Sequence, residues 1–168
     1  TVGCLLLLGG CRAKTATATP PKAAPTTFVR GVTLHTKTDQ QNQQKLANFI
    51  QSKMVTKQGI YTNYVDTKTR QVGAATGHEL LSESAGMWLQ YLAENHQYRA
   101  FRQFYRETVK TFGDSGQFSY RYDPRSKKRF AVNATLDDLR IIRALNLYDA
   151  QTNSCLLYTS DAADEGLG

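Results

Sequence analysis

Apolar residues recur at helical spacing in four separate stretches of this chain, and this pattern constrains the fold more than any other feature. The stretches predict helices over about residues 38–55, 78–94 and 97–112, and a fourth helix from residue 135. The predicted apolar faces are Leu46, Phe49, Ile50 and Met54; Leu80, Ser84, Met87, Trp88 and Tyr91; Phe101, Tyr105, Val109 and Phe112; and Leu139, Ile142 and Leu145. Short linkers and the absence of an alternating βαβ pattern predict a mainly α architecture.

Local signals suggest where these helices begin and end. Thr38 or Asp39 can cap the first helix, and Gly113 can stop the third. Thr135 can cap the fourth, with Asp138 at the capping-box position. One small β-hairpin is expected between the third and fourth helices, from 117–122 through a turn at 123–126 to 129–132.

The chain begins with a short apolar run that ends at a cysteine. The run is too short to span a bilayer and is typical of the end of a signal peptide, residues 1–10. Leu8-Gly9-Gly10-Cys11 resembles the bacterial lipobox, in which the cysteine is lipidated. A polar, Ala- and Thr-rich tether follows to residue 27 and is expected to be disordered. We therefore expect a lipoprotein on the extracellular face of the bacterial cell membrane; the alternative is a plain signal peptide that contains a cysteine.

The last residues carry a different signal. The string from Cys155 to Glu165 resembles the translation of a sequencing-library adapter, although a natural polar tail is the alternative. We expect residues 155–168 to be non-native, which leaves residues 28–154 as one domain or part of one.

Charge and cysteine content narrow the possible partners. The formal charge is +7, and it rises to +10 without the three acidic residues of the tail. Such a charge suits an anionic neighbour such as a cell-wall polymer or lipid headgroups, or it serves solubility alone; nucleic acid is a poor candidate. The folded part lacks cysteine and its histidines show no metal-ligand spacing, so we expect no disulfide, metal or cofactor.

Glu83 is the most informative single residue. In a helix it shares a face with Leu80 and Met87, so a carboxylate would lie on an apolar stripe. Burial disfavours the charged form, and a neutral carboxylic acid is what a glycosidase needs to protonate a leaving oxygen. The alternative is a glutamate on the helix surface. We expect Glu79 to favour the helix N-terminus and His78 to make a local polar contact.

A family resemblance adds to this interpretation. Matching segments are Ser82-Glu83 through Leu92, residues 101–105, 110–112 and 118–120, and Ala134-Thr135-Leu136-Asp137-Asp138. In order and spacing they resemble glycoside hydrolase family 8, whose members are six-hairpin (α/α) toroids that cut β-linked glucans, xylans or chitosan by inversion. The resemblance implies that Glu83 is the general acid and that Asp137 or Asp138 supplies an active-site aspartate.

Two departures and one missing residue qualify this resemblance. Ser84 replaces a motif glycine, and Leu136 stands where the first motif aspartate belongs unless one residue is inserted; Asp137 and Asp138 could instead cap the helix. The family's general base lies well downstream, beyond Ser154, so we expect this chain alone to be inactive.

Aromatic residues offer candidate sugar platforms. Tyr61, Tyr64, Trp88 and Tyr120 are the substrate-binding candidates, although Trp88, with Tyr91, is at least as consistent with core packing. The sequence therefore predicts a monomeric, lipid-anchored glycoside hydrolase that acts on a polysaccharide or oligosaccharide. The alternative is a non-catalytic glycan-binding or envelope lipoprotein. In both cases the expected fold is a partial (α/α) six-hairpin toroid with one small β-hairpin, as the family resemblance implies.

Overall fold

The computed structural model describes residues 36–154, which form a mainly helical unit with small antiparallel sheets. The helices are α1 (Lys37–Lys53), α2 (Ser82–Glu94), α3 (Tyr98–Phe112) and α4 (Thr135–Thr152). The strands are β1 (Leu80–Leu81), β2 (Gly113–Asp114), β3 (Gln117–Phe118), β4 (Arg121–Asp123) and β5 (Lys128–Arg129). The predicted mainly α class is confirmed.

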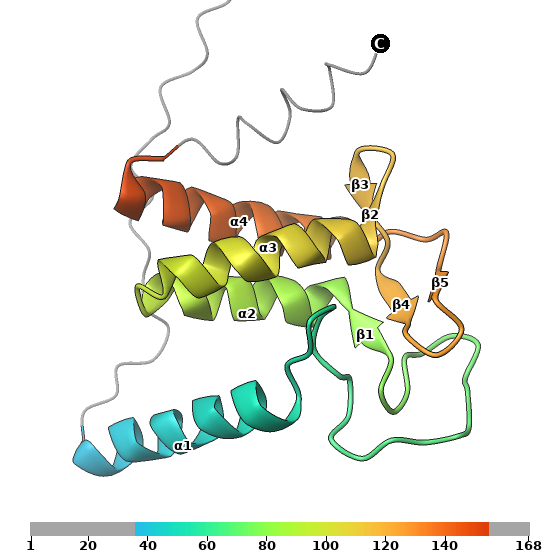
Figure 1. The fold of residues 1–168 in the computed structure, drawn as a ribbon, viewed down its shortest axis with the longest axis horizontal. Helices are drawn as coiled ribbons and strands as arrows, with labels where there is room; N and C mark the ends of the chain where they lie inside the picture. The colour runs from blue at the N-terminus through green and yellow to red at the C-terminus, as the bar shows by residue number, and fades with distance from the viewer. Residues whose placement is uncertain (1–35, 155–168) are drawn as a thin grey trace, which may run out of the picture. The chain divides into compact units, whose positions relative to one another are not determined.

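α2, α3 and α4 lie side by side, and the strands gather at one end of them (Figure 1). α2 and α4 both start at this strand end, whereas α3 runs in the opposite direction. The N-terminal ends of α2 and α4 are therefore neighbours, and this arrangement determines the geometry of the candidate site.

A capping box fixes the start of α1, with its cap two or three residues earlier than the sequence suggested. The Thr36 side chain accepts a hydrogen bond from the Asp39 backbone N–H at 3.1 Å, and the Asp39 carboxylate accepts from the Thr36 N–H at 3.3 Å. The prediction that Thr38 or Asp39 is the cap was wrong, because Asp39 occupies the third helical position of this reciprocal motif.

The second helix starts four residues later than predicted. Leu80 and Leu81 are extended and pair antiparallel with Tyr122 and Arg121 of β4. The Ser82 backbone N–H then donates to the Tyr120 carbonyl at 3.0 Å. Residues 80–81 therefore belong to the sheet and residues 78–79 precede it, so the prediction that Glu79 favours a helix N-terminus was wrong.

The β structure is larger than one hairpin. β1, β4 and β5 form a three-stranded antiparallel sheet, and β2 and β3 form a separate two-stranded sheet. The predicted turn at 123–126 does join two paired strands, β4 and β5. The segment 117–118 instead pairs with the residues that follow α3.

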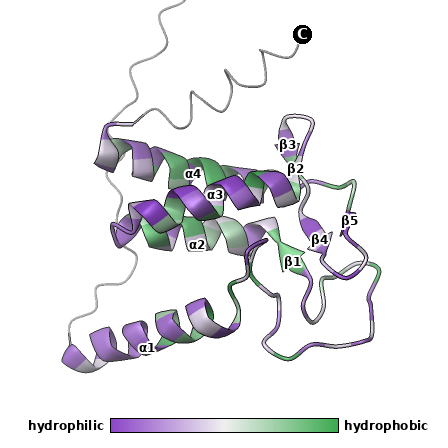
Figure 2. Cartoon of the chain, viewed as in Figure 1, coloured by the Kyte–Doolittle hydropathy of each residue, from purple (hydrophilic) through white to green (hydrophobic). Residues whose placement is uncertain are grey.

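α2 packs closely on α4 because small residues line its inner face. Ala85 and Ala93 are fully buried, and a Cβ on Gly86 would lie 2.9 Å from the Arg140 Cβ. Phe101 of α3 stacks on Tyr148 of α4 with ring centroids 4.5 Å apart. Hydrophobic residues are more frequent along α2 and α4 than along α1 and α3, which are largely hydrophilic (Figure 2). The core therefore lies among α2, α3 and α4.

The start and the apolar stripe of α4 differ from the prediction. Ala134 precedes the helix without a side-chain cap, so the predicted Thr135–Asp138 capping box was wrong. Leu145 is buried, but Leu139 is 54% exposed and Ile142 is 39% exposed. The buried residues Ile141, Ala144 and Leu145 show that α4 is rotated so that Arg140 and Ile141, not Leu139 and Ile142, face α2.

No helix within residues 36–154 is both long and apolar enough to cross a bilayer. The predicted signal peptide, Cys11 and tether, and the predicted non-native tail, lie outside the described residues. Those assignments stay predictions.

Candidate functional site

The starts of α2 and α4 form a polar cluster at the strand end of the helices. The Ser82 hydroxyl donates to Asp137 Oδ2 at 3.1 Å across 55 sequence positions. The Arg140 guanidinium contacts Asp137 Oδ1 through Nη1 and Glu83 Oε1 through Nη2, each at 3.1 Å. One arginine thus holds two of the predicted catalytic carboxylates, one from each helix. We call Ser82, Glu83, Asp137 and Arg140 the carboxylate cluster; Asp138 is the next residue of α4 after Asp137.

Glu83 is less buried than expected. Its side chain is 42% exposed, and Met87, one turn later, is also exposed. Leu80 is fully buried but lies in β1, so it does not share a helical face with Glu83. The prediction that Glu83 lies on a buried apolar stripe was therefore wrong. Its carboxylate opens to solvent on one side and meets Arg140 on the other.

The two aspartates have different surroundings. Asp137 is only 7% exposed, and both its oxygens have partners, Ser82 and Arg140. Asp138 Oδ1 is buried and, within residues 36–154, has no hydrogen-bond partner. Burial raises the pKa of Asp138; a hydrogen bond from the Phe118 backbone opposes this, and the charge of Asp137 adds to it. Neither aspartate caps α4, so the capping alternative does not describe their contacts.

The four candidate aromatic residues are not gathered in one place. Tyr120 adjoins the carboxylate cluster, because its carbonyl accepts the Ser82 backbone N–H. Tyr61 and Trp88 instead line a groove beside α2. Tyr64 is 54% exposed and lies against Phe49 of α1, with ring centroids 5.1 Å apart.

The groove lies between α1 and α2 and has a volume of about 470 Å³. Its lining is mostly apolar and includes Leu46, Ile50, Met87, Trp88 and Tyr91. Trp88 is 7% exposed and stacks on Tyr91 at 4.8 Å, as the core-packing interpretation of these rings predicted. Ser84, which follows Glu83, also lines the groove, so the carboxylate cluster and the groove meet at the first turn of α2.

A buried ion pair supports the loop that precedes β1. The Arg121 guanidinium donates to both oxygens of Glu79 at 2.7 and 2.8 Å, and each side chain is 1% exposed. Burial alone would lower the pKa of Arg121, but the hydrogen bonds and charge of Glu79 outweigh it and raise that pKa. Arg121 also donates to the Gln71 carbonyl at 3.1 Å, and its guanidinium lies 4.4 Å from the Phe130 ring centroid. The pair fixes the loop and β1, and through β1 the start of α2.

His78 makes the local polar contacts that the sequence suggested. Its Nε2 lies 3.2 Å from the Tyr64 carbonyl, its Nδ1 lies 3.7 Å from Asp66, and its ring stacks on Tyr61. Residues 36–154 contain no group of three or more His, Cys, Asp or Glu side chains placed to hold a metal ion.

Sequence reasoning missed Arg140 and Arg121. Arg140 lies three residues after Asp137, a spacing that predicts an ion pair on a helix. Its contact with Glu83 depends on how α2 packs against α4. Arg121 offered no comparable signal, because its partner Glu79 lies 42 positions away.

Comparison with known proteins supports a glycosidase-like fold. A solved structure described as a novel alpha-amylase from Clostridium perfringens is similar to this chain, with a TM-score of 0.55 and 32% sequence identity. The similarity covers 65% of this chain and 31% of that chain, so this chain spans less than a third of its length. No family model and no curated protein matches the chain. The similarity does not single out glycoside hydrolase family 8.

Proposed function

We propose that the carboxylate cluster is part of the active site of a glycoside hydrolase, with Glu83 as the general acid. The observation that carries this proposal is the juxtaposition of Glu83 and Asp137 on one arginine, from helices that start at the same end of the molecule. The similarity to a structure named as an alpha-amylase supports the same class of reaction.

The geometry suggests a different role for each of the three carboxylates, Glu83, Asp137 and Asp138. Glu83 is open to solvent on one side, so its carboxyl group is accessible to the oxygen of a glycosidic bond, to which a general acid would donate its proton. Asp137 would keep the charge of Arg140 compensated when Glu83 is protonated. Asp138, with a free buried oxygen and a raised pKa, is placed to bind a sugar hydroxyl or hold a proton. An inverting reaction also needs a base on the other side of the sugar, and we propose that it lies beyond Ser154.

We propose a glucan as the substrate. The name alpha-amylase denotes action on α-linked glucans such as starch, whereas the resemblance to family 8 favours β-linked chains. Soluble starch and a mixed-linkage β-glucan are therefore the two substrates to compare first.

The test uses the complete gene product that contains this chain. Glu83→Gln should lower kcat for glucan hydrolysis by about 10²- to 10⁴-fold, because the amide cannot donate the proton. The matched control is Glu94→Gln, on the last turn of the same helix, which should leave kcat unchanged. Release of reducing sugar measures the rate, and proton NMR of the first product tests inversion. Unchanged hydrolysis in Glu83→Gln would show that Glu83 is not the acid.

A second function, glycan binding without turnover, is favoured by one observation. Leu136 is 60% exposed at the position where the family motif has its first aspartate. If the complete protein hydrolyses neither glucan but binds one of them by calorimetry, this second function would replace the first.

We also propose that Cys11 anchors the protein to the membrane. Cys11→Ser should abolish incorporation of labelled palmitate and move the protein from the membrane fraction to the medium. Retention of the label in Cys11→Ser would contradict lipidation at this residue.

A further inference from the structure

The outward face of α3 carries a row of cations. Arg99, Arg102, Arg106 and Lys110 are exposed, at spacings of three or four residues. The opposite face is buried in the core and consists of Phe101, Phe104, Tyr105, Thr108, Thr111 and Phe112. The helix is thus anchored by its apolar side and presents a continuous positive side to solvent.

Little of this charge is neutralised by neighbouring carboxylates. Within residues 36–154, Arg99 and Arg106 have no hydrogen bond or ion pair. Arg102 donates to the Tyr148 hydroxyl at 2.9 Å and has no ion pair with a carboxylate in the described part of the chain. Among the described residues, Lys110 is the one member of the row with an acidic partner, Glu107, at 3.1 Å. Folding therefore does not explain why this face is cationic.

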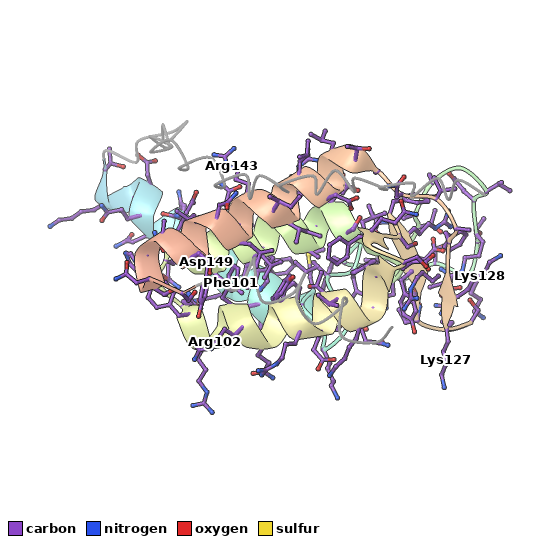
Figure 3. All side chains as sticks on the ribbon, turned by 90° about the horizontal axis from the view of Figure 1, so that it is seen from above. Phe101, Arg102, Lys127, Lys128, Arg143 and Asp149 are labelled. Atoms are coloured by element: carbon purple, nitrogen blue, oxygen red, sulfur yellow. The ribbon has the colours of Figure 1, made fainter. Side chains whose placement is uncertain are left out.

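A fifth cation extends the row past the end of the helix. Arg129 of β5 donates through Nε to the Thr111 carbonyl at 3.0 Å and through Nη2 to the Lys110 carbonyl at 3.0 Å. A cation at these terminal carbonyls is favoured by the helix dipole. Figure 3 shows Arg102 on α3 and Lys127 and Lys128 at the hairpin beyond its C-terminal end. We call Arg99, Arg102, Arg106, Lys110 and Arg129 the cationic track.

The shape and composition of the track fit a linear polyanion. At a rise of about 1.5 Å per residue, Arg99 and Lys110 are about 16 Å apart along the helix, with about one cation per turn. Four of the five cations are arginines, whose planar guanidinium suits bidentate contact with phosphate. A bilayer is a poorer fit, because a helix that lies on a membrane inserts its apolar face, and that face of α3 is buried.

We propose that the cationic track binds a linear polymer of phosphate groups, such as a phosphodiester-linked wall polymer or inorganic polyphosphate. The polymer lies along α3 and continues past Arg129 onto the β4–β5 hairpin. This surface is separate from the carboxylate cluster, and its role does not depend on hydrolysis of a glycan.

The experiment measures binding of the whole 168-residue chain to long-chain polyphosphate and to polyglycerol phosphate, between about 50 and about 200 mM salt. Binding should weaken with salt, and the slope of log K against log salt should be about −3 for four or five phosphate contacts. Arg99→Gln with Arg106→Gln should weaken binding on the order of tenfold and reduce the slope by about 1.4. Both residues are exposed and make no contact that the fold needs, so the melting temperature should not change.

The matched control removes the same charge elsewhere. Lys37→Gln with Lys45→Gln acts on exposed residues of α1 and should leave the salt slope unchanged. Equal weakening in the two double variants would overturn the proposal, because net charge alone would then explain binding. Tighter binding to anionic phospholipid vesicles than to either polymer, at equal phosphate, would also overturn it in favour of a membrane surface. A preference between the two polymers would identify the source of the phosphate.

Discussion

The partly buried position of Asp138 disfavours the charged form of its side chain. Its Oδ1 is buried without a hydrogen-bond partner among residues 36–154, and burial raises its pKa above the ordinary 3.8. As pH rises past about 3.8, the unfolded chain releases this proton before the folded protein does. The contribution of Asp138 to stability is therefore present at low pH and is lost as pH rises through its folded pKa.

Asp138→Asn should raise the melting temperature near neutral pH, because the amide carries no charge to bury. The gap between variant and wild type should shrink as the pH falls below about 3.8, where both side chains are neutral. Thermal unfolding followed by circular dichroism between about pH 3 and about pH 7 measures this.

The neighbouring residue supplies the control. Asp137→Asn removes half of an ion pair with Arg140 and should lower the melting temperature near neutral pH, the opposite sign. If both variants shifted stability in the same direction, the contrast drawn between the two aspartates would be incorrect.

The sequence was sufficient to predict which carboxylates belong to the candidate site, but not how buried they are or which residues they contact. Glu83, Asp137 and Asp138 were chosen from a motif, and the structure brings Glu83 and Asp137 together on Arg140. The predicted burial of Glu83 depended on counting Leu80 as part of its helix. Pairing of Leu80 with Tyr122 removes it from the helix, and such long-range pairing has no local signature.

At the scale of elements, the spacing between α2 and α4 depends on Gly86. A Cβ there would lie 2.9 Å from the Arg140 Cβ and 3.3 Å from the Ile141 backbone nitrogen. These contacts are too short, and a backbone atom cannot rotate away as a side chain can. Gly86 therefore sets how closely the two helices that carry the carboxylate cluster approach.

Gly86→Ala should destabilise the protein by about 1 kcal/mol. Overpacking lowers the free energy of unfolding by about 1–3 kcal/mol, and the higher helix propensity of alanine offsets up to about 1 kcal/mol of this loss. Urea unfolding measures the change. Gly73→Ala is the control, because a Cβ at Gly73 meets nothing within 4 Å. A Gly86→Ala protein as stable as Gly73→Ala would show that the helices can separate at no cost.

Helical periodicity predicted all four helices within residues 36–154, but their ends were less certain. The observed start of α3 differs from the predicted start by one residue, because the buried face of this helix is strongly apolar and Gly113 follows its last residue. The start of α2 shifted by four residues because it depends on strand pairing, and the caps of α1 and α4 are Thr36 and Ala134 instead of the predicted residues. Such starts reflect tertiary contacts as much as local propensity.

At the scale of the whole molecule, the pair Glu79–Arg121 joins the loop after α1 to the sheet. Glu79 also accepts the Thr76 backbone N–H at 2.7 Å, and Arg70 lies 3.6 Å from it. Removing one partner of a buried pair leaves an uncompensated charge, so Arg121→Met should cost about 3–5 kcal/mol. Replacement of both, Glu79→Leu with Arg121→Met, should recover a large part of this loss.

Chemical denaturation of Glu79→Leu, Arg121→Met and the double variant measures the coupling free energy between the two side chains. A double variant as unstable as the sum of the single variants would mean that the two side chains do not act as a pair.

The Glu79–Arg121 pair also limits which substitutions can accumulate in this sequence during evolution. A substitution of Glu79 or Arg121 alone leaves a buried charge without its partner and destabilises the protein. Replacement of the pair by another pair therefore requires an intermediate sequence that folds poorly. Natural relatives should therefore keep both residues or have lost both. Their joint inheritance would mark the loop and the sheet as one evolutionary unit, although 42 positions separate them in the sequence.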